Sequence, residues 1–421
     1  MSLSRRDILK LALGSGIALA LPGRARASGA RVVVIGGGFG GATAAKYLRM
    51  WAPEIDVTLV ERDRRFVSCP LSNRVLAGVA DLDDLTRDYS TLASRWGVTV
   101  VHEEATRIDT DRRLVQLAGG ASLPYDRLII SPGLDLLMDA VPGWETQAAR
   151  ENVLHAWKAG PQTDALRRQL ESMSDGGVYA MTVPRSPYRC PPGPYERACQ
   201  VAWYFKTHKP RSKVLILDAN EKVQSKELLF LDAWKDMYPG IVEYRPNSTL
   251  TAIDARTRTA RLEFEDVRAD VLNVVPPQRA GRIAADAGLI TTNDKWCAVD
   301  FLTFESMVRP NVHVLGDAVL AAPLMPKSGH MANQHAKVCA AAVAALLRGQ
   351  AVNPAPMMTN TCYSFVSDTE VVHIASVHEY NNDKKTFTIV EGSGGLSSGP
   401  SAREGSYAES WGRNIWADML A

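Results

Sequence analysis

The sequence predicts an α/β protein with two Rossmann-like dinucleotide-binding domains, the first of them discontinuous, and a small α+β domain at the C-terminus. Three observations predict this class. A β-branched run leads into a glycine-rich turn near the N-terminus, a second buried run ends in Gly-Asp much later in the chain, and the last part of the chain alternates apolar and polar residues. Such patterns are typical of buried parallel strands and of half-buried antiparallel strands, respectively.

The N-terminal pattern is a dinucleotide fingerprint in its required context. Residues 31–35 read as a buried strand, and Gly36, Gly38 and Gly41 follow at G-x-G-x-x-G spacing before a run of small helix formers. Glu61 closes the next predicted strand, twenty residues beyond Gly41. The glycines permit a tight turn, close approach of a pyrophosphate and close helix–strand packing, and Glu61 is placed to accept hydrogen bonds from a ribose. The sequence therefore predicts a bound dinucleotide.

The second pattern identifies the dinucleotide. Residues 311–315 read as a buried strand that runs into Gly316 and Asp317, and a helical pattern covers residues 332–347. Together with the N-terminal fingerprint, this arrangement resembles the closing motif of FAD domains, in which the aspartate contacts the ribityl chain and the pyrophosphate. We therefore expect an FAD-binding domain made of residues 28–142 and 281–355.

The insertion, residues 143–280, is expected to be a second Rossmann-like unit. Its candidate strands, 176–183 and 213–218, lack a glycine fingerprint after them. The first leads into a proline-rich stretch, 184–194, and proline has no N–H group with which to cradle a pyrophosphate. We expect an NAD-like domain without a nicotinamide site.

The remaining segments are the C-terminal domain and an N-terminal leader. In the domain, residues 356–421, segments 370–377 and 386–390 read as strands of a small antiparallel sheet and 392–399 as a loop. The leader, residues 1–27, has a twin-arginine motif, an apolar run and a small-x-small cleavage site. It predicts export of the folded protein to the periplasm; its apolar run is short for the alternative, a membrane anchor.

The composition argues against nucleic acid as a partner. Apolar residues make up 46% of the chain and charged residues 22%, as in ordinary globular proteins. The whole chain has a net charge of +2, and the leader alone contributes +4, from five basic residues and one acidic residue; the rest carries about −2. No later run predicts a membrane-spanning helix, so membrane insertion is not expected either.

The six cysteines include three in unusual contexts. No C-x-x-C or C-x-x-C-H pattern occurs, which argues against attached haem, an iron–sulfur site, zinc or an adjacent redox pair. Cys199 and Cys339 lie in alanine-rich helical surroundings typical of buried small hydrophobes. The three others of interest are Cys69, after the first βαβ unit, Cys190, in the proline-rich loop, and Cys362. Spacing alone leaves open whether Cys190 and Cys362 form a static disulfide or remain two core thiols.

These segments resemble the flavoprotein subunit of flavocytochrome c sulfide dehydrogenase, a member of the glutathione-reductase-like flavoproteins. The resemblance covers the whole chain after the leader and is carried by GGGFGGATAAKY, SCPLSN, CPPGPYERA, VPPQRAG, MPKSG and NTCYS. It implies that FAD is bound covalently through an 8α-S-cysteinyl thioether at Cys69, and that Cys190 and Cys362 form a redox-active disulfide beside the flavin. It also implies an acid–base role for Glu196 and an aromatic lid at Trp411.

The implied activity is oxidation of sulfide to zero-valent sulfur or polysulfide, with electrons passed to a c-type cytochrome subunit in a heterodimer. Hydrosulfide would attack one sulfur of the pair and leave a persulfide and a thiolate. Glu196 would manage the proton, although a helix-capping role beside Arg197 is the alternative. Lys327 would neutralise negative charge on the flavin, with surface solvation as its alternative.

Two other functions stay open at this level. A sulfide:quinone oxidoreductase would need an apolar, amphipathic C-terminal helix pair for membrane docking, and residues 402–421 carry several charges. An accessory flavoprotein that maintains partner proteins of sulfur oxidation through thiol–disulfide exchange would use the same groups.

Overall fold

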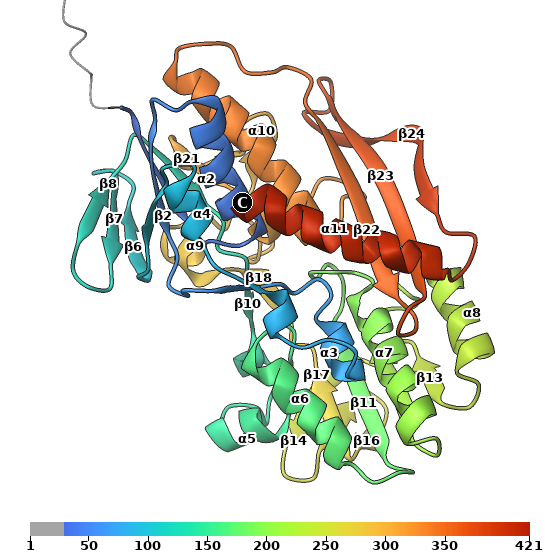
Figure 1. The fold of residues 1–421 in the computed structure, drawn as a ribbon. Helices are drawn as coiled ribbons and strands as arrows, with labels where there is room; N and C mark the ends of the chain where they lie inside the picture. The colour runs from blue at the N-terminus through green and yellow to red at the C-terminus, as the bar shows by residue number, and fades with distance from the viewer. Residues whose placement is uncertain (1–28) are drawn as a thin grey trace, which may run out of the picture.

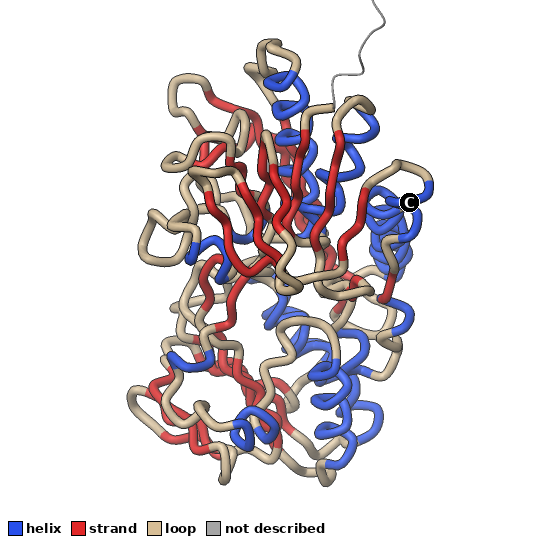
Figure 2. Tube along the Cα trace, turned by 90° about the vertical axis from the view of Figure 1, so that its left-hand side faces the viewer, coloured by secondary structure: helices blue, strands red, loops and turns tan. Residues whose placement is uncertain are grey.

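The computed structural model describes residues 29–421, and these form three packed units (Figures 1 and 2). The predicted leader, with its twin-arginine motif, lies outside the described residues, so export remains a prediction. No helix within residues 29–421 is both long enough and apolar enough to cross a membrane. The mixed α/β architecture with parallel sheets confirms the expected fold class.

The N-terminal unit is built on a seven-stranded sheet of order β19-β20-β21-β9-β1-β2-β5. Its central strands are parallel. Strand β21 comes much later in the chain than β9 and pairs with it, so both pieces of the expected FAD-binding domain contribute to one sheet. Its elements are β1 (Arg31–Ile35), α2 (Phe39–Trp51), β2 (Asp56–Val60), α4 (Ser90–Ser94), β5 (Thr99–Val101), β9 (Arg127–Ile130), α9 (Arg282–Asp286), β19 (Val299–Asp300), β20 (Glu305–Ser306), β21 (Val312–Val314), the 3-10 turn η3 (Gly316–Ala318) and α10 (Gly329–Leu347).

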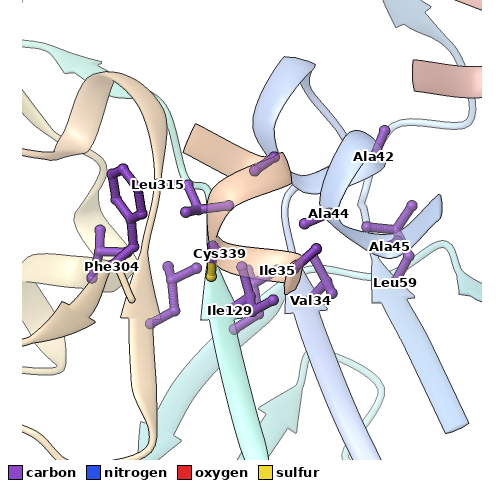
Figure 3. Close-up of a cluster of buried hydrophobic side chains, with 14 of the residues drawn as sticks. Val34, Ile35, Ala42, Ala44, Ala45, Leu59, Ile129, Phe304, Leu315 and Cys339 are labelled. Carbon is purple, nitrogen blue, oxygen red and sulfur yellow. The ribbon is translucent and has the colours of Figure 1, made fainter. Parts of the chain in front are cut away.

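Burial explains why the β-branched run becomes the central strand. Val34 pairs with Leu59 on one side and Ile129 on the other, and all three are fully buried. The small residues Ala44 and Ala45 of α2 are fully buried, Ala45 on the side of Leu59 (Figure 3), and α2 also packs against α10. Parallel strands buried on both faces read as continuous apolar runs rather than alternating ones.

Short elements surround this sheet. They are β3 (Phe66–Val67), α3 (Asn73–Ala77), η1 (Asp83–Leu85), β4 (Thr86–Arg87), the three-stranded sheet β6 (Ala105–Asp109), β7 (Leu114–Leu117) and β8 (Ser122–Pro124), and the connecting pair β10 (Leu134–Leu136) and β18 (Gln278–Ala280), with η2 (Met138–Ala140) after β10. The helix α3 leaves the first unit and packs against helices of the second (Figure 1).

The second unit has a four-stranded parallel sheet of order β13-β12-β11-β17. Its elements are α5 (Gln147–Asn152), α6 (Pro161–Ser172), β11 (Val178–Val183), α7 (Gly193–His208), β12 (Lys213–Asp218), α8 (Glu227–Met237), β13 (Val242–Arg245), the antiparallel β14 (Leu250–Asp254), β15 (Thr259–Leu262) and β16 (Asp266–Arg268), and β17 (Val271–Val274). The predicted strand 213–218 is therefore observed as β12. A nine-residue loop, residues 184–192, lies between β11 and α7 in place of a tight glycine turn.

The C-terminal unit is a three-stranded antiparallel sheet covered by one helix. Its elements are β22 (Met357–Phe365), β23 (Val371–Asn381), β24 (Thr386–Leu396) and α11 (Ala402–Leu420). The expected loop over residues 392–399 is wrong for its first half, because β24 continues to Leu396 through the glycines. A Cβ on Gly394 would lie 2.2 Å from the carbonyl oxygen of Ala375 on β23, so the strand pairing itself requires glycine there.

Candidate functional site

The predicted dinucleotide turn is built around glycines that no larger residue could replace. Gly36 has φ of +95°, and a Cβ there would lie 2.3 Å from the carbonyl oxygen of Ser131. A Cβ on Gly41 would lie 1.8 Å from the carbonyl oxygen of Gly36, where α2 packs on the turn. These two glycines are required by the protein's own backbone, as the fingerprint predicts.

Gly38 differs, because a Cβ there would meet no protein atom within 4 Å. The protein fold alone therefore does not require glycine at this position, whereas a pyrophosphate lying against the turn does. The neighbouring Gly37 N–H donates to Glu61 Oε2 at 2.7 Å, and the Tyr89 hydroxyl donates to the Gly37 carbonyl at 3.2 Å. Glu61 thus holds the turn in shape from the end of β2.

The Gly-Asp turn places a buried, unpartnered acceptor near the start of α10. Asp317 Oδ1 is shielded from solvent and has no hydrogen-bond partner among the described residues. Burial raises the pKa of Asp317, and the charges of Arg189 and Lys327 oppose that rise. A small cavity of about 10 Å³ lies beside it, lined by Gly316, Ser328 and His335 among others. An orphaned acceptor and an open cradle at Gly38 fit the hydroxyl and pyrophosphate groups of FAD.

Lys327 is buried, which overturns the surface-solvation interpretation of this residue. Its Nζ donates to the carbonyl oxygens of Asp317 at 2.8 Å and Val319 at 2.5 Å, and it lies 3.7 Å from the centre of the Trp296 ring. Burial lowers the pKa of Lys327 to about 8, while Asp317 raises it. The Lys327 ammonium therefore stabilises the Gly-Asp turn through its hydrogen bonds to these two carbonyl oxygens.

Cys69 lies in the loop between β3 and α3, where two serines hold the backbone. Ser72 Oγ donates to the Cys69 carbonyl at 2.6 Å, and Ser68 Oγ donates to the Pro70 carbonyl at 3.0 Å. The Cys69 sulfur accepts a hydrogen bond from the Ala159 N–H at 3.4 Å. The sulfur is therefore fixed at the boundary between the first and second units.

Cys190 is delivered by the long loop that replaces the glycine turn of the second unit. Its backbone is left-handed, with φ of +58°, and its N–H donates to the Lys327 carbonyl at 2.8 Å. A Cβ on Gly193, at the start of α7, would lie 3.0 Å from the Cys190 sulfur. The CPPG motif thus turns the chain tightly under the sulfur and ties it to the FAD-binding unit.

Arg189 connects the predicted groups electrostatically. Burial alone would lower the pKa of this guanidinium, but the charges of Cys69, Asp317 and Cys190 more than offset this and raise its pKa. The Arg189 guanidinium therefore lies close enough to interact electrostatically with Cys69, with Cys190 and with the turn at Asp317. Its side chain also donates to the Trp157 carbonyl.

Cys362 lies on β22, next to a buried lysine. Lys226 Nζ lies 3.8 Å from the Cys362 sulfur, 3.0 Å from the Cys362 carbonyl oxygen and 2.9 Å from Ser364 Oγ. Burial raises the pKa of Cys362, and Lys226 is the main influence that lowers it.

Glu196 joins the three segments that carry the site cysteines. Its Oε2 accepts from Asn73 Nδ2 at 2.9 Å, on α3 after the Cys69 loop, and its Oε1 accepts from the Phe365 N–H at 3.0 Å, at the end of β22. Figure 1 shows α3 and α7 side by side, with β22 reaching α7 from above. Glu196 itself is in the first turn of α7. The helix-capping alternative is therefore not observed; the carboxylate bonds outward, to two other segments.

The two predicted redox cysteines share one electrostatic environment. Burial raises the pKa of Cys190, and Cys362 and Glu196 raise it further. Cys362 likewise has Glu196 and Lys226 as its charged neighbours. All six cysteines, which lie within residues 29–421, are free thiols in this structure. Cys199 and Cys339 are fully buried in helices, as expected.

Trp411 lies beside the same region, on α11. Its ring centroid is 6.3 Å from that of Tyr363, the residue after Cys362, and 5.8 Å from that of His330, at the start of α10. The structure thus places the predicted aromatic residue between the Cys362 strand and the Gly-Asp side of the site.

Sequence reasoning missed four contributors, namely Asn73, Tyr89, Arg189 and Lys226. Arg189 directly precedes Cys190 in the proline-rich loop. A basic residue next to a cysteine in such a loop could have indicated that Arg189 belongs to the site. Nothing in the sequence around Lys226 points to Cys362, which is more than a hundred residues away in the chain.

Comparisons with known proteins agree with this geometry. The model of the central region of the "sulfide dehydrogenase [flavocytochrome c] flavoprotein chain" matches residues 163–276, and that of the flavin-binding region of flavocytochrome c sulphide dehydrogenase matches residues 354–420. A pyridine nucleotide-disulphide oxidoreductase model matches residues 30–178. The sulfide dehydrogenase flavoprotein chain of Chlorobaculum thiosulfatiphilum is 67% identical over 45 residues, which are 94% of that sequence and 11% of this chain.

The chain belongs to the flavoprotein chains of flavocytochrome c sulfide dehydrogenase. This confirms the family and the flavin cofactor expected from the sequence. More distant relatives include a mitochondrial sulfide:quinone oxidoreductase of Dictyostelium discoideum, 24% identical over 300 residues; the match covers 68% of this chain and 65% of the relative's length. The solved structure of the sulfide:quinone oxidoreductase from Aquifex aeolicus shares the fold, with a TM-score of 0.75 at 18% identity over 93% of this chain and 91% of that one.

The glycines give a test of where the pyrophosphate lies. Gly41→Ala is expected to lower the free energy of unfolding by about 1–3 kcal/mol, because its Cβ overlaps backbone. Gly38→Ala is expected to change the stability of flavin-free protein by less than about 0.5 kcal/mol but to reduce the flavin bound per chain, because only the cofactor meets its Cβ. Urea denaturation of protein made under riboflavin limitation and flavin absorbance measure the two effects. Normal flavin content in Gly38→Ala would contradict this placement.

Proposed function

We propose that this flavoprotein oxidises sulfide to zero-valent sulfur or polysulfide through a Cys190–Cys362 disulfide beside covalent FAD. The observation that carries the proposal is the convergence of three distant segments on Glu196, which brings the environments of these two cysteines together. The matched family and the relatives named for sulfide oxidation give the substrate class.

The first step is thiol–disulfide chemistry carried out by the protein itself. Hydrosulfide attacks one sulfur of the disulfide, a sulfur–sulfur bond to the substrate forms, and the bond between the cysteines breaks. The products are a cysteine persulfide and a cysteine thiolate, so charge is conserved and the disulfide gains two electrons. A second hydrosulfide then takes the outer sulfur of the persulfide, which leaves as hydrodisulfide, and a cysteine thiol remains. Bound FAD would supply the two-electron acceptor chemistry through which this thiol and the thiolate return to the disulfide with release of one proton.

Glu196 is suited to hold a proton in this step. It is 7% exposed, and burial raises the pKa of its carboxyl, although the hydrogen bonds from Phe365 and Asn73 lower it. A carboxyl group whose pKa is raised by burial can take up and release a proton, such as the proton that a bound thiol or persulfide carries.

The groups that would hold FAD come from both halves of the first unit. The turn at Gly36, Gly38 and Gly41 with Glu61 would take the pyrophosphate and adenosine ribose, and Gly316 and Asp317 the ribityl side. Cys69 would form the thioether, which prevents loss of the cofactor after export. Lys327 and Arg189 would place positive charge beside the cofactor and Trp411 an aromatic ring.

A nicotinamide nucleotide is a poor fit for the second unit. In Rossmann folds the acid that ends the second strand binds a ribose. Asp218 ends β12, but it is fully buried and accepts hydrogen bonds from Tyr195 at 2.7 Å, Tyr244 at 3.1 Å and Asn220 at 2.9 Å and 2.7 Å. Its acceptor capacity is used by protein groups. We therefore propose a c-type cytochrome subunit as the electron acceptor, in the periplasm to which the leader directs the chain.

The C-terminal helix favours the cytochrome over a membrane quinone as acceptor. The apolar residues Ile415, Trp416, Met419 and Leu420 of α11 are buried within the chain. Asp418 holds this helix down by accepting from Tyr47 at 2.6 Å and Asn333 at 2.7 Å and by pairing with Lys337 at 2.9 Å. The apolar face of α11 is thus already used in internal packing.

The covalent bond is tested by acid precipitation. Wild-type protein is expected to keep its flavin colour in the acid pellet, and Cys69→Ala to release the flavin to the supernatant, since only a covalent bond survives denaturation. Absorbance of both fractions is the measurement. Cys297→Ala serves as a control that retains the colour; release of flavin from wild-type protein would contradict the thioether.

The disulfide mechanism is tested by anaerobic bleaching of the flavin with sulfide. Cys190→Ala and Cys362→Ala are each expected to lower the bleaching rate to the background of free flavin, because neither variant can form the disulfide. Cys339→Ala, which removes a buried sulfur from the core of the first unit (Figure 3), is expected to bleach at the wild-type rate.

The same sample then tests the acceptor. Bleached wild-type protein is expected to regain its colour on addition of an oxidised c-type cytochrome faster than on addition of a short-chain quinone.

For the test with sulfide, wild-type bleaching rates in both Cys190→Ala and Cys362→Ala would refute the disulfide mechanism.

A further inference from the structure

Lys226 has no role in any of the motifs, yet it is the charged side chain that contacts a redox cysteine directly. It is 4% exposed, and the recorded partners of its ammonium group are all on β22: the carbonyl oxygen and sulfur of Cys362 and the hydroxyl of Ser364. None of these partners is a carboxylate. The charge of Lys226 acts on the buried carboxyl of Glu196 without a hydrogen bond or ion pair between them, so a thiolate at Cys362 would be the anion in direct contact with the ammonium.

Lys226 has a strained backbone conformation, and in this conformation its side chain reaches β22. Its φ of +55° and ψ of +39° are left-handed values, which a residue other than glycine adopts rarely. The residue immediately precedes α8, and its side chain crosses to β22 rather than pointing to solvent. Strain of this kind persists where the surrounding structure fixes it, frequently at functional sites.

We infer that Lys226 is a catalytic residue that makes the disulfide asymmetric: hydrosulfide attacks the Cys190 sulfur, and the Cys362 sulfur leaves as a thiolate paired with the Lys226 ammonium. This deepens the proposed function and rests on it. A new bond forms between the substrate sulfur and Cys190 Sγ, and the Cys190–Cys362 bond breaks. Its electron pair moves to Cys362 Sγ, and the substrate proton stays on the Cys190 persulfide.

Two features of the site favour this direction over the reverse. The ammonium lies 3.8 Å from Cys362 Sγ and has no recorded contact with Cys190. Attack by thiol-type nucleophiles proceeds faster when the leaving sulfur is the better stabilised thiolate. Lys226 opposes the burial-driven rise in the pKa of Cys362 more than any other group, whereas Arg189 opposes the rise in the pKa of Cys190 more than Lys226 does.

Peptide mapping of trapped wild-type protein tests the direction. Oxidised protein is mixed anaerobically with one equivalent of sulfide, quenched with iodoacetamide and digested without reductant. We expect the alkylated persulfide on the Cys190 peptide and a simple alkylated thiol on the Cys362 peptide. A persulfide mainly on Cys362 would overturn the inference while leaving the proposed function intact. Absence of a persulfide from both peptides would overturn both.

Substitution of the lysine tests the cause. Lys226→Met is expected to slow sulfide-driven bleaching about 10- to 100-fold, as for loss of a hydrogen bond to a charged group. It is also expected to reduce the iodoacetamide labelling rate of Cys362 relative to Cys190 in reduced protein. Lys226→Arg, which keeps the charge, is expected to restore much of both.

Lys206 supplies a matched control. Its Nζ donates to the Met237 carbonyl at 3.0 Å and lies 5.8 Å from the Tyr238 ring centroid, much as Lys226 lies 5.9 Å from that of Phe230. Lys206 has no cysteine partner, so Lys206→Met is expected to leave the labelling ratio unchanged. Equal labelling ratios in Lys226→Met and wild type, with flavin content retained, would overturn the inference.

Discussion

The site depends on one buried carboxyl group. Glu196 binds the amide of Asn73 on one side and the Phe365 N–H on the other. Through these two bonds the helix that follows Cys190 is fixed to the helix after the Cys69 loop and to the strand that carries Cys362. A buried polar group that lost these partners would be left unsatisfied at considerable cost. The same bonds that position the cysteines therefore stabilise the contact between the three units, and Glu196 serves both structure and proton transfer in the proposed reaction.

The second unit keeps the framework of a dinucleotide-binding domain but lacks the glycine turn that such domains use. Where a tight glycine turn would expose backbone N–H groups to a pyrophosphate, a long proline-rich loop carries Arg189 and Cys190 to the first unit. The acid at the end of β12 is enclosed by Tyr195 and Tyr244. The sheet and helices are kept, while the edge that would bind a nucleotide carries Arg189 and Cys190 of the proposed site. Fold alone would not have distinguished these functions.

Local patterns predicted what local physics determines. Gly36 has a φ of +95° in the turn itself, and Gly41 is required by the carbonyl of Gly36 in the same βαβ unit. These glycines could be identified from their spacing, and β12 could be identified because it is a continuous apolar run. The contact of Lys226 with Cys362 could not be identified in this way, because it depends on how the segment before α8 lies against β22 of another unit. The expected loop over residues 392–399 was wrong for a related reason: β24 extends through Gly394 because pairing with β23 overrides the turn preference of glycine. The cysteine roles came from resemblance to a family, and the structure adds the shared environment of Cys190 and Cys362.

The bond between those two sulfurs is the central claim, and non-reducing peptide mapping of the mature, air-oxidised protein tests it most directly. The protein is denatured, alkylated without reductant, digested and analysed by mass spectrometry. The account predicts a cross-linked pair of peptides joined through Cys190 and Cys362, with Cys199, Cys297 and Cys339 alkylated as free thiols. Recovery of Cys190 and Cys362 as separately alkylated thiols, or in linkage to other cysteines, would contradict it.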